Sequence, residues 1–184
     1  KQTDSMLGFK DSFVYDNWGL LLCCAGIMGG VFAGSISDHL FQSRRGPVAA
    51  ILYAVMLVCS VALVFLYDTA IVGWLVVFMS MAVIGVHGML SGTASMDFGG
   101  KKNVGVAVGI IDGFVYLGTG VMALTYGMIL PEEQLDAADK IIGPATQPEN
   151  WIGWPLAMVP MALIGTLLAT RVWNAKPKGK AAAH

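Results

Sequence analysis

Long apolar runs separated by short polar segments are the feature that most constrains the fold of this chain. Each run has about 20 residues or more, the length that a helix needs to cross the hydrocarbon core of a bilayer. The sequence is 56% hydrophobic and 12% charged, whereas soluble domains are about 25% charged. The runs predict an all-α membrane protein with five transmembrane helices, at about residues 18–36, 48–67, 70–95, 104–130 and 151–172.

The polar segments divide the chain. We expect an extracytoplasmic loop at residues 1–16, a transmembrane helical domain at 17–174 and a cytoplasmic tail at 175–184. The sequence opens on a polar segment without an initiator Met, and its span number is odd. We therefore expect that at least one span precedes it and that the chain is the C-terminal part of a longer protein.

Loop charges support this topology. With five spans, segments 37–47 and 96–103 and the C-terminal tail fall on one side of the membrane. They carry eight of the eleven basic residues, namely Arg44, Arg45, Lys101, Lys102, Arg171, Lys176, Lys178 and Lys180. Because positive loops stay in the cytoplasm, we expect a cytoplasmic C-terminus and a multi-pass protein of the bacterial inner membrane. The net charge of −1 gives no indication of a nucleic-acid partner.

The first of these loops, G-S-I-S-D-H-L-F-Q-S-R-R-G-P, is a candidate gate. Its expected gating residues are Gly34, Asp38, Arg44 and Arg45, and Asp38 could pair with an arginine in one conformation and release it in another. The alternative is an ordinary solvated loop whose arginines only set the topology. In the second such loop, the expected residues of the cytoplasmic mouth are Asp97, Lys101 and Lys102. The two lysines could attract anions to this mouth, or could serve topology alone.

Polar side chains inside the spans are candidates for a substrate cavity. Asp112 lies about 15 Å past Lys102 at about 1.5 Å per residue, near the expected midplane, where a carboxylate is costly unless it is paired, protonated or hydrated. Tyr116 and Thr119 follow at helical spacing, and His87 lies inside the third span. For Asp112 and His87 the alternative is a structural hydrogen bond to a neighbouring helix.

Further sequence features bear on helix packing, on metal and cofactor binding, and on enzymatic activity. Gly105, Gly109 and Gly113 recur every four residues, which is typical of close helix packing in membranes. No His, Cys or acidic cluster has metal-ligand spacing, so we expect no metal and no cofactor. The sequence contains no G-x-S-x-G or H-E-x-x-H motif, so we do not expect an enzyme.

Two motifs resemble known transporters. The loop with Gly34, Asp38 and the paired arginines resembles the loop signature of the major facilitator superfamily. The stretch from Phe98 to Gly118 resembles the organophosphate:phosphate antiporter family of that superfamily, which includes glycerol-3-phosphate and hexose-phosphate transporters. The matching positions are Asp97, Lys101, Lys102, Gly105, Gly109, Tyr116, Leu117 and Gly118.

The resemblance implies that the five spans are helices 8–12 of a twelve-helix fold. It implies a secondary active transporter that moves phosphorylated organic solutes, in exchange for inorganic phosphate, by alternating access. Its partners would be the lipid bilayer, the missing N-terminal half, and a small anionic solute and phosphate. The family's phosphate-binding arginines lie on the first and seventh helices, upstream of this chain.

One departure bears on the substrate. Relatives often carry an acid just before A-G-x-x-G on the eighth helix, where this chain has Cys23 and Cys24. This difference weakens the case for glycerol-3-phosphate itself. A transporter-like sugar-phosphate sensor, or a carrier of another small solute such as a carboxylate, remains as an alternative.

Overall fold

The computed structural model describes residues 12–176, and these residues are mostly helical. Residues 1–11 and 177–184, and with them most of the expected outer loop and tail, lie outside the described part. The helices are α2 (Phe13–Asp16), α3 (Trp18–His39), α4 (Arg45–Leu66), α5 (Val72–Gly88), the π-helix η1 (Met89–Ala94), α6 (Ser95–Ile129) and α7 (Gly153–Arg171).

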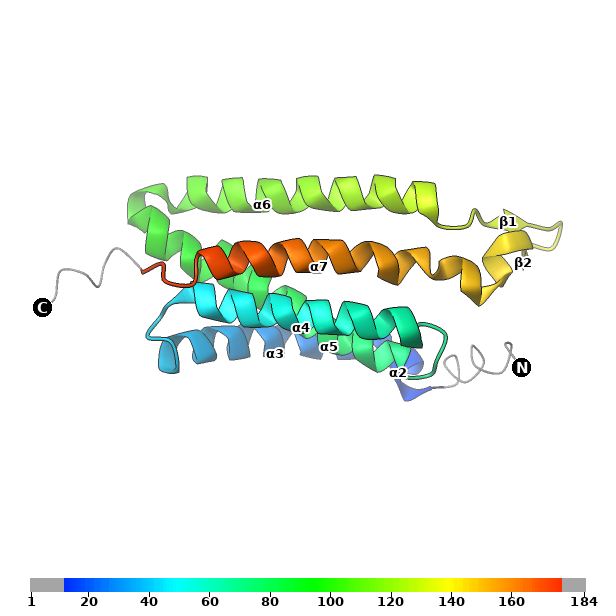
Figure 1. Ribbon diagram of the computed structural model, residues 1–184, viewed down its shortest axis with the longest axis horizontal. Helices are drawn as coiled ribbons and strands as arrows, with labels where there is room; N and C mark the ends of the chain where they lie inside the picture. Colours follow the sequence, from blue (N-terminus) through cyan, green and yellow to red (C-terminus); the bar gives the residue numbers. More distant parts are fainter. Residues whose placement is uncertain (1–11, 177–184) are drawn as a thin grey trace, which may run out of the picture.

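Four segments of the described chain are long and apolar enough to cross a bilayer: Trp18–Leu40, Arg45–Leu66, Val72–Ile129 and Pro148–Arg171. This confirms the prediction of an all-α membrane protein. The third segment has 58 residues and contains one break, at Gly100, where φ is 66°. Because glycine adopts positive φ without steric cost, the chain turns back here, and the rest of α6 runs back along the bundle (Figure 1).

This turn is tighter than the expected loop at 96–103. Residues on both sides of Gly100 keep helical backbone angles. Before it, α5, η1 and the start of α6 form one continuous helix, since the junction residues stay in the right-handed helical region. With Gly100 as the turn, successive long helices alternate in direction (Figure 1).

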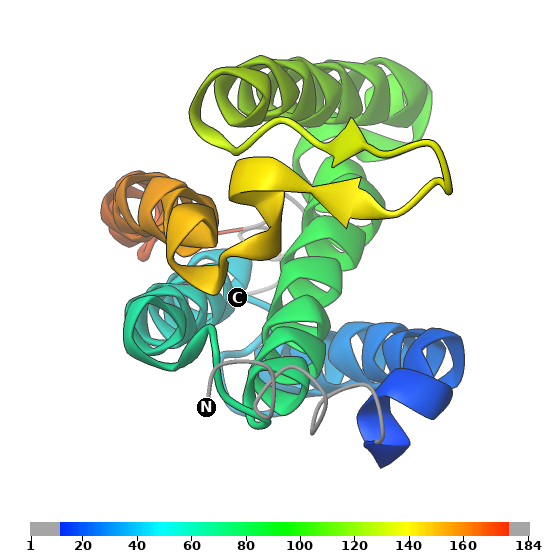
Figure 2. The ribbon, with the colours of Figure 1, turned by 90° about the vertical axis from the view of Figure 1, so that its right-hand side faces the viewer.

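The helices pack in two main pairs, α4 against α7 and α3 against α5. Figure 2 shows α5 passing between α3 and α4 and rising obliquely towards α6. One core cluster forms around Leu63, Met79 and Ala82, and a second around Ala33, Val48 and Ala169. Helix α6 stands apart from these cores, and Ser95 is its only buried residue.

Glycines allow the closest helix crossings. A Cβ on Gly29 of α3 would overlap the Met81 carbonyl of α5, and one on Gly85 would lie 2.9 Å from the Gly29 carbonyl oxygen. Similar overlaps would arise between Gly46 and Val172 and between Gly165 and Tyr53. Gly29, Gly85 and Gly46 therefore let backbones approach as small residues do in membranes, while Gly165 makes room for the Tyr53 ring.

The expected packing face on α6 has no partner within the described chain. A Cβ on Gly105, Gly109 or Gly113 would meet no described atom within 4 Å. A packing role for these three glycines stays a prediction that requires a partner outside residues 12–176.

The polar segment between α6 and α7 contains a small hairpin. Strand β1 (Gln134–Leu135) pairs antiparallel with β2 (Ile141–Ile142), and the short helices η2 (Gly143–Thr146) and η3 (Pro148–Trp151) follow. The Asp136 carboxylate accepts the backbone N–H groups of Lys140 and Ala138 at 3.0 and 2.8 Å. These two hydrogen bonds hold the pKa of Asp136 below its usual value, so the turn is fixed by an ionised carboxylate.

Candidate functional site

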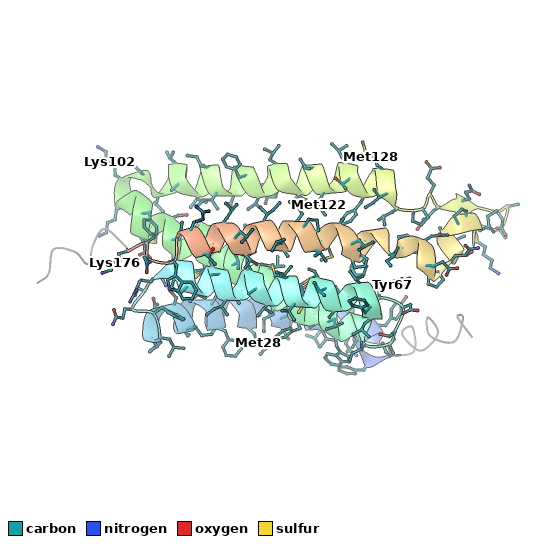
Figure 3. The ribbon with its side chains drawn as sticks, viewed as in Figure 1. Met28, Tyr67, Lys102, Met122, Met128 and Lys176 are labelled. Atoms are coloured by element: carbon teal, nitrogen blue, oxygen red, sulfur yellow. The ribbon has the colours of Figure 1, made fainter. Side chains whose placement is uncertain are left out.

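The alternating helices gather basic residues at one end of the bundle. Figure 3 labels Lys102 and Lys176 at this end, with Tyr67 and Met128 towards the opposite end. We call the first the basic end; its described members are Arg44, Arg45, Lys101, Lys102, Arg171 and Lys176. The opposite, acidic end carries Asp16, Asp68, Glu132, Glu133, Asp136, Asp139 and Glu149. Because each helix reverses the direction of the one before it, segments distant in sequence meet at the same end.

Arg45 is the centre of the basic end. Its side chain is 9% exposed. Its Nη1 donates to Asp38 Oδ1 at 2.8 Å and to Ser37 Oγ at 2.9 Å, and its Nε donates to Asp97 Oδ2 at 2.9 Å. This Arg45 cluster (Ser37, Asp38, Arg45 and Asp97) joins the end of α3, the start of α4 and the start of α6. It unites residues that the sequence assigned separately to a gate and to a mouth.

The turn before α4 positions Arg45. Gln42 and Ser43 have positive φ, 53° and 63°, and the Ser43 N–H donates to the Ser37 carbonyl at 2.8 Å. The Ser37 hydroxyl donates to the Arg44 carbonyl at 3.2 Å, which holds the residue before Arg45. The turn thereby directs Arg45 inward, towards the end of α3.

Arg44 differs from its neighbour. It precedes the first residue of α4 with an extended backbone and is half-buried. Within the described chain its side chain makes no ion pair or hydrogen bond. Gly34, the other expected loop residue, faces open space where a Cβ would stand. Of the four expected gate residues, the structure thus brings only Asp38 and Arg45 together.

The Arg45 cluster holds one positive and two negative charges. The planar guanidinium offers five donors in a fixed arrangement, so it can hold two carboxylates at once. The two sides of the cluster differ, because the Asp38 side chain is 52% exposed and that of Asp97 is 25% exposed. The contact to Asp38 is therefore the more easily hydrated one, and the contact to Asp97 the more protected.

Asp112 is paired with a residue of the π-helix. The Ser91 hydroxyl donates to Asp112 Oδ1 at 2.5 Å, which ties α6 to η1. Two more hydroxyls of this stretch donate to backbone carbonyls: Thr93 to the Met89 carbonyl, and Ser95 to the Leu90 carbonyl, which also accepts the Ser95 backbone N–H. Single π-helical turns within α-helices are frequent at functional sites.

The sequence analysis did not identify Ser91 or Ser37 as site residues, and it did not predict the π-helix. The run L-S-G-T-A-S at residues 90–95 carried a signal, because three hydroxyls in six residues are unusual inside an apolar span. Hydroxyls in membrane helices bond either their own backbone or a neighbouring helix. The sequence alone does not decide which of the three takes the second role.

The other expected cavity residues are not joined to Asp112 by any hydrogen bond within the described chain. Tyr116 is 73% exposed, and the Thr119 hydroxyl donates to the Val115 carbonyl of its own helix at 3.0 Å. His87 is half-buried, one turn before Ser91 on the same helical run. No group of three His, Cys, Asp or Glu residues suitable for a metal occurs in residues 12–176.

The chain is similar to curated transport proteins. It is 28% identical to the glycerol-3-phosphate transporter of Bacillus subtilis (strain 168) over 164 residues, which are 87% of this chain and 32% of the relative. It is 26% identical, over 154 residues, to proteins named "Probable hexose phosphate transport protein" in Chlamydia trachomatis and Chlamydia muridarum, covering 82% of this chain and 30% of each relative.

The chain thus spans about a third of the length of these relatives. No protein-family model matches it, and no solved structure matches it. The relatives are named as transport proteins for phosphorylated solutes, and this similarity supports a transport function for the chain. It also agrees with the expectation that the chain is not an enzyme. Multiple apolar helices and bacterial transporter relatives together indicate a multi-pass membrane protein.

Proposed function

We propose that this chain is the C-terminal part of a secondary transporter of the major facilitator superfamily, which exchanges phosphorylated organic solutes for inorganic phosphate. The observation that carries the proposal is the similarity to phosphorylated-solute transporters over most of the chain. In this proposal the long helices are helices 8–12 of a twelve-helix fold. The basic end, with the C-terminus, faces the cytoplasm of the bacterial inner membrane, as positive loops do.

The Arg45 cluster is the proposed gate. It joins three helices through one guanidinium, so its opening frees the ends of α3, α4 and α6 together. Alternating access requires contacts that form in one state and break in another. The half-exposed Asp38 is the side of the cluster at which we propose that the break begins.

Asp112 is the proposed polar group of the central cavity, with Ser91 as its partner. A carboxylate deep in a membrane helix marks a solute or proton pathway by default. Helix α6 fits the wall of a cavity, because its apolar residues are largely exposed in this chain. We propose that the missing N-terminal half faces it and supplies the phosphate-binding arginines, while Lys101 and Lys102 draw anions to the cytoplasmic mouth.

Substitution of Asp112 by Asn in the full-length protein is expected to reduce exchange about tenfold or more. Asn keeps the shape but removes the charge, and hydrogen bonds to charged groups contribute about 1.5–3 kcal/mol. The measurement is uptake of radiolabelled glycerol-3-phosphate or hexose phosphate into phosphate-loaded proteoliposomes, normalised to the amount of inserted protein.

Thr125→Val is the matched control, because the Thr125 hydroxyl donates to the Val121 carbonyl of its own helix and Thr125 is not among the candidate cavity residues; we expect nearly unchanged exchange. Ser91→Ala leaves the carboxylate and should give an intermediate loss. Unchanged uptake in Asp112→Asn would make Asp112 a structural residue. Absence of exchange of either solute by the unaltered protein would contradict the proposed transport function itself.

A further inference from the structure

A cavity of about 750 Å³ lies at the acidic end, away from the Arg45 cluster. Its walls come from segments far apart in sequence: α2, the start of α3, the α4–α5 connection, the start of α5, η3 and the start of α7. Five of its lining residues are aromatic, namely Tyr15, Trp18, Tyr67, Trp151 and Trp154. Its volume lies within the range of small-molecule sites, roughly 300–1,000 Å³.

The aromatic walls are held in place by the fold. The Trp151 indole N–H donates to the Ala145 carbonyl at 3.0 Å, so its donor is already used and the ring offers only apolar and π surface. The Trp154 carbonyl accepts the Tyr126 hydroxyl at 3.4 Å. Nearby, the rings of Phe13 and Trp74 stack at 6.5 Å, which fixes α2 against α5.

The described lining of this cavity carries only negative charge. Asp68 is the only charged residue among the described residues that line it. Burial and the carboxylates of Asp68 and Glu149 raise the pKa of Tyr67, so a second acid also acts on the lining. Carboxylates at the mouth repel anions, while the faces of Trp and Tyr rings attract cations.

The position of the cavity near the membrane boundary also restricts the kind of ligand that it can bind. Aromatic side chains at the ends of membrane helices occupy the boundary between hydrocarbon and water. A ligand at this depth can keep an apolar part among the rings and a charged part next to Asp68, which is exposed. Simple inorganic ions would leave the apolar walls unused.

We propose that the cavity lined by these five rings and Asp68 binds an organic ammonium cation with an apolar body. The ammonium group lies against the aromatic faces near the Asp68 carboxylate. The ligand is either a free alkyl- or arylammonium ion or the ethanolamine headgroup of a membrane phospholipid. The site is separate from the proposed transport pathway, whose solutes are anions.

Binding can be tested on the full-length protein in nanodiscs of phosphatidylglycerol, which contains no ammonium group. We expect benzyltrimethylammonium to quench tryptophan fluorescence saturably, and its neutral isostere neopentylbenzene to quench at least tenfold less effectively. Asp68→Asn should weaken binding of the cation about tenfold, and Trp151→Leu should weaken it further.

Trp173→Leu is the control, because Trp173 packs against Phe41 outside this cavity; it should leave the affinity unchanged. Nanodiscs that contain phosphatidylethanolamine separate the two sources, since competition with benzyltrimethylammonium assigns the site to the lipid and its absence to a free cation. Equal binding of cation and isostere, or unchanged affinity in Asp68→Asn, would overturn the proposal. Asp68 lies on the surface, so its variant should fold even if Trp151→Leu does not.

Discussion

Replacement of Arg45 by Gln is expected to abolish most transport and to destabilise the helical domain, whereas Arg44→Gln should have little effect. Arg45 is nearly buried and satisfies two carboxylates and a hydroxyl. Its neighbour makes no side-chain bond within the described chain. Removing one partner of a buried ion pair costs about 3–5 kcal/mol, and we expect about 3 kcal/mol here because Asp38 is half-exposed.

Comparing Arg45→Gln with Arg44→Gln is informative because both variants remove one positive charge from the same loop. Thermal unfolding in detergent and solute exchange in proteoliposomes should be measured for each. Equal losses in the two variants would mean that the arginines act only through topology or surface charge. Arg45→Lys should restore little, because an ammonium group cannot reproduce the planar contact to Asp38 and Asp97.

Substitution of Gly29 by Ala is the second change with a large expected effect. The added Cβ would overlap the Met81 carbonyl where α3 crosses α5. Backbone atoms cannot move aside as a flexible side chain can, so the two helices must separate. Overpacking of this kind costs about 1–3 kcal/mol and occasionally more, and we expect about 3 kcal/mol because this crossing joins one of the two main helix pairs.

Gly30→Ala provides the matched control on the adjacent residue, where a Cβ would meet nothing within 4 Å. It should keep the melting temperature or raise it slightly, because alanine favours a helix more than glycine does. The measurement is the melting temperature of each purified variant and its yield from the membrane. If Gly29→Ala and Gly30→Ala unfold at the same temperature, the close contact between Gly29 and the Met81 carbonyl would be contradicted.

Two parts of the candidate site show the limits of sequence reasoning. The short spacing between Asp38 and Arg45 made an ion pair predictable, because one loop brings the two residues together. The contact between Arg45 and Asp97 spans 52 residues and depends on how α5, η1 and α6 pass the start of α4. Similarly, Asp112 was identifiable as a costly charge, but its partner Ser91 became evident only once the π-helix placed it.

Hydropathy and loop charge by themselves determined that this chain is a helical membrane protein with basic residues gathered at one end, because burial of backbone polar groups in lipid leaves few alternatives. Only the tertiary structure decided which small residues lie at helix crossings: Gly29 and Gly85 do, whereas Gly105, Gly109 and Gly113 meet no described atom. A glycine pattern is the same on a crossing face and on an open one. The distinction depends on the position of a second helix, which the local sequence does not contain.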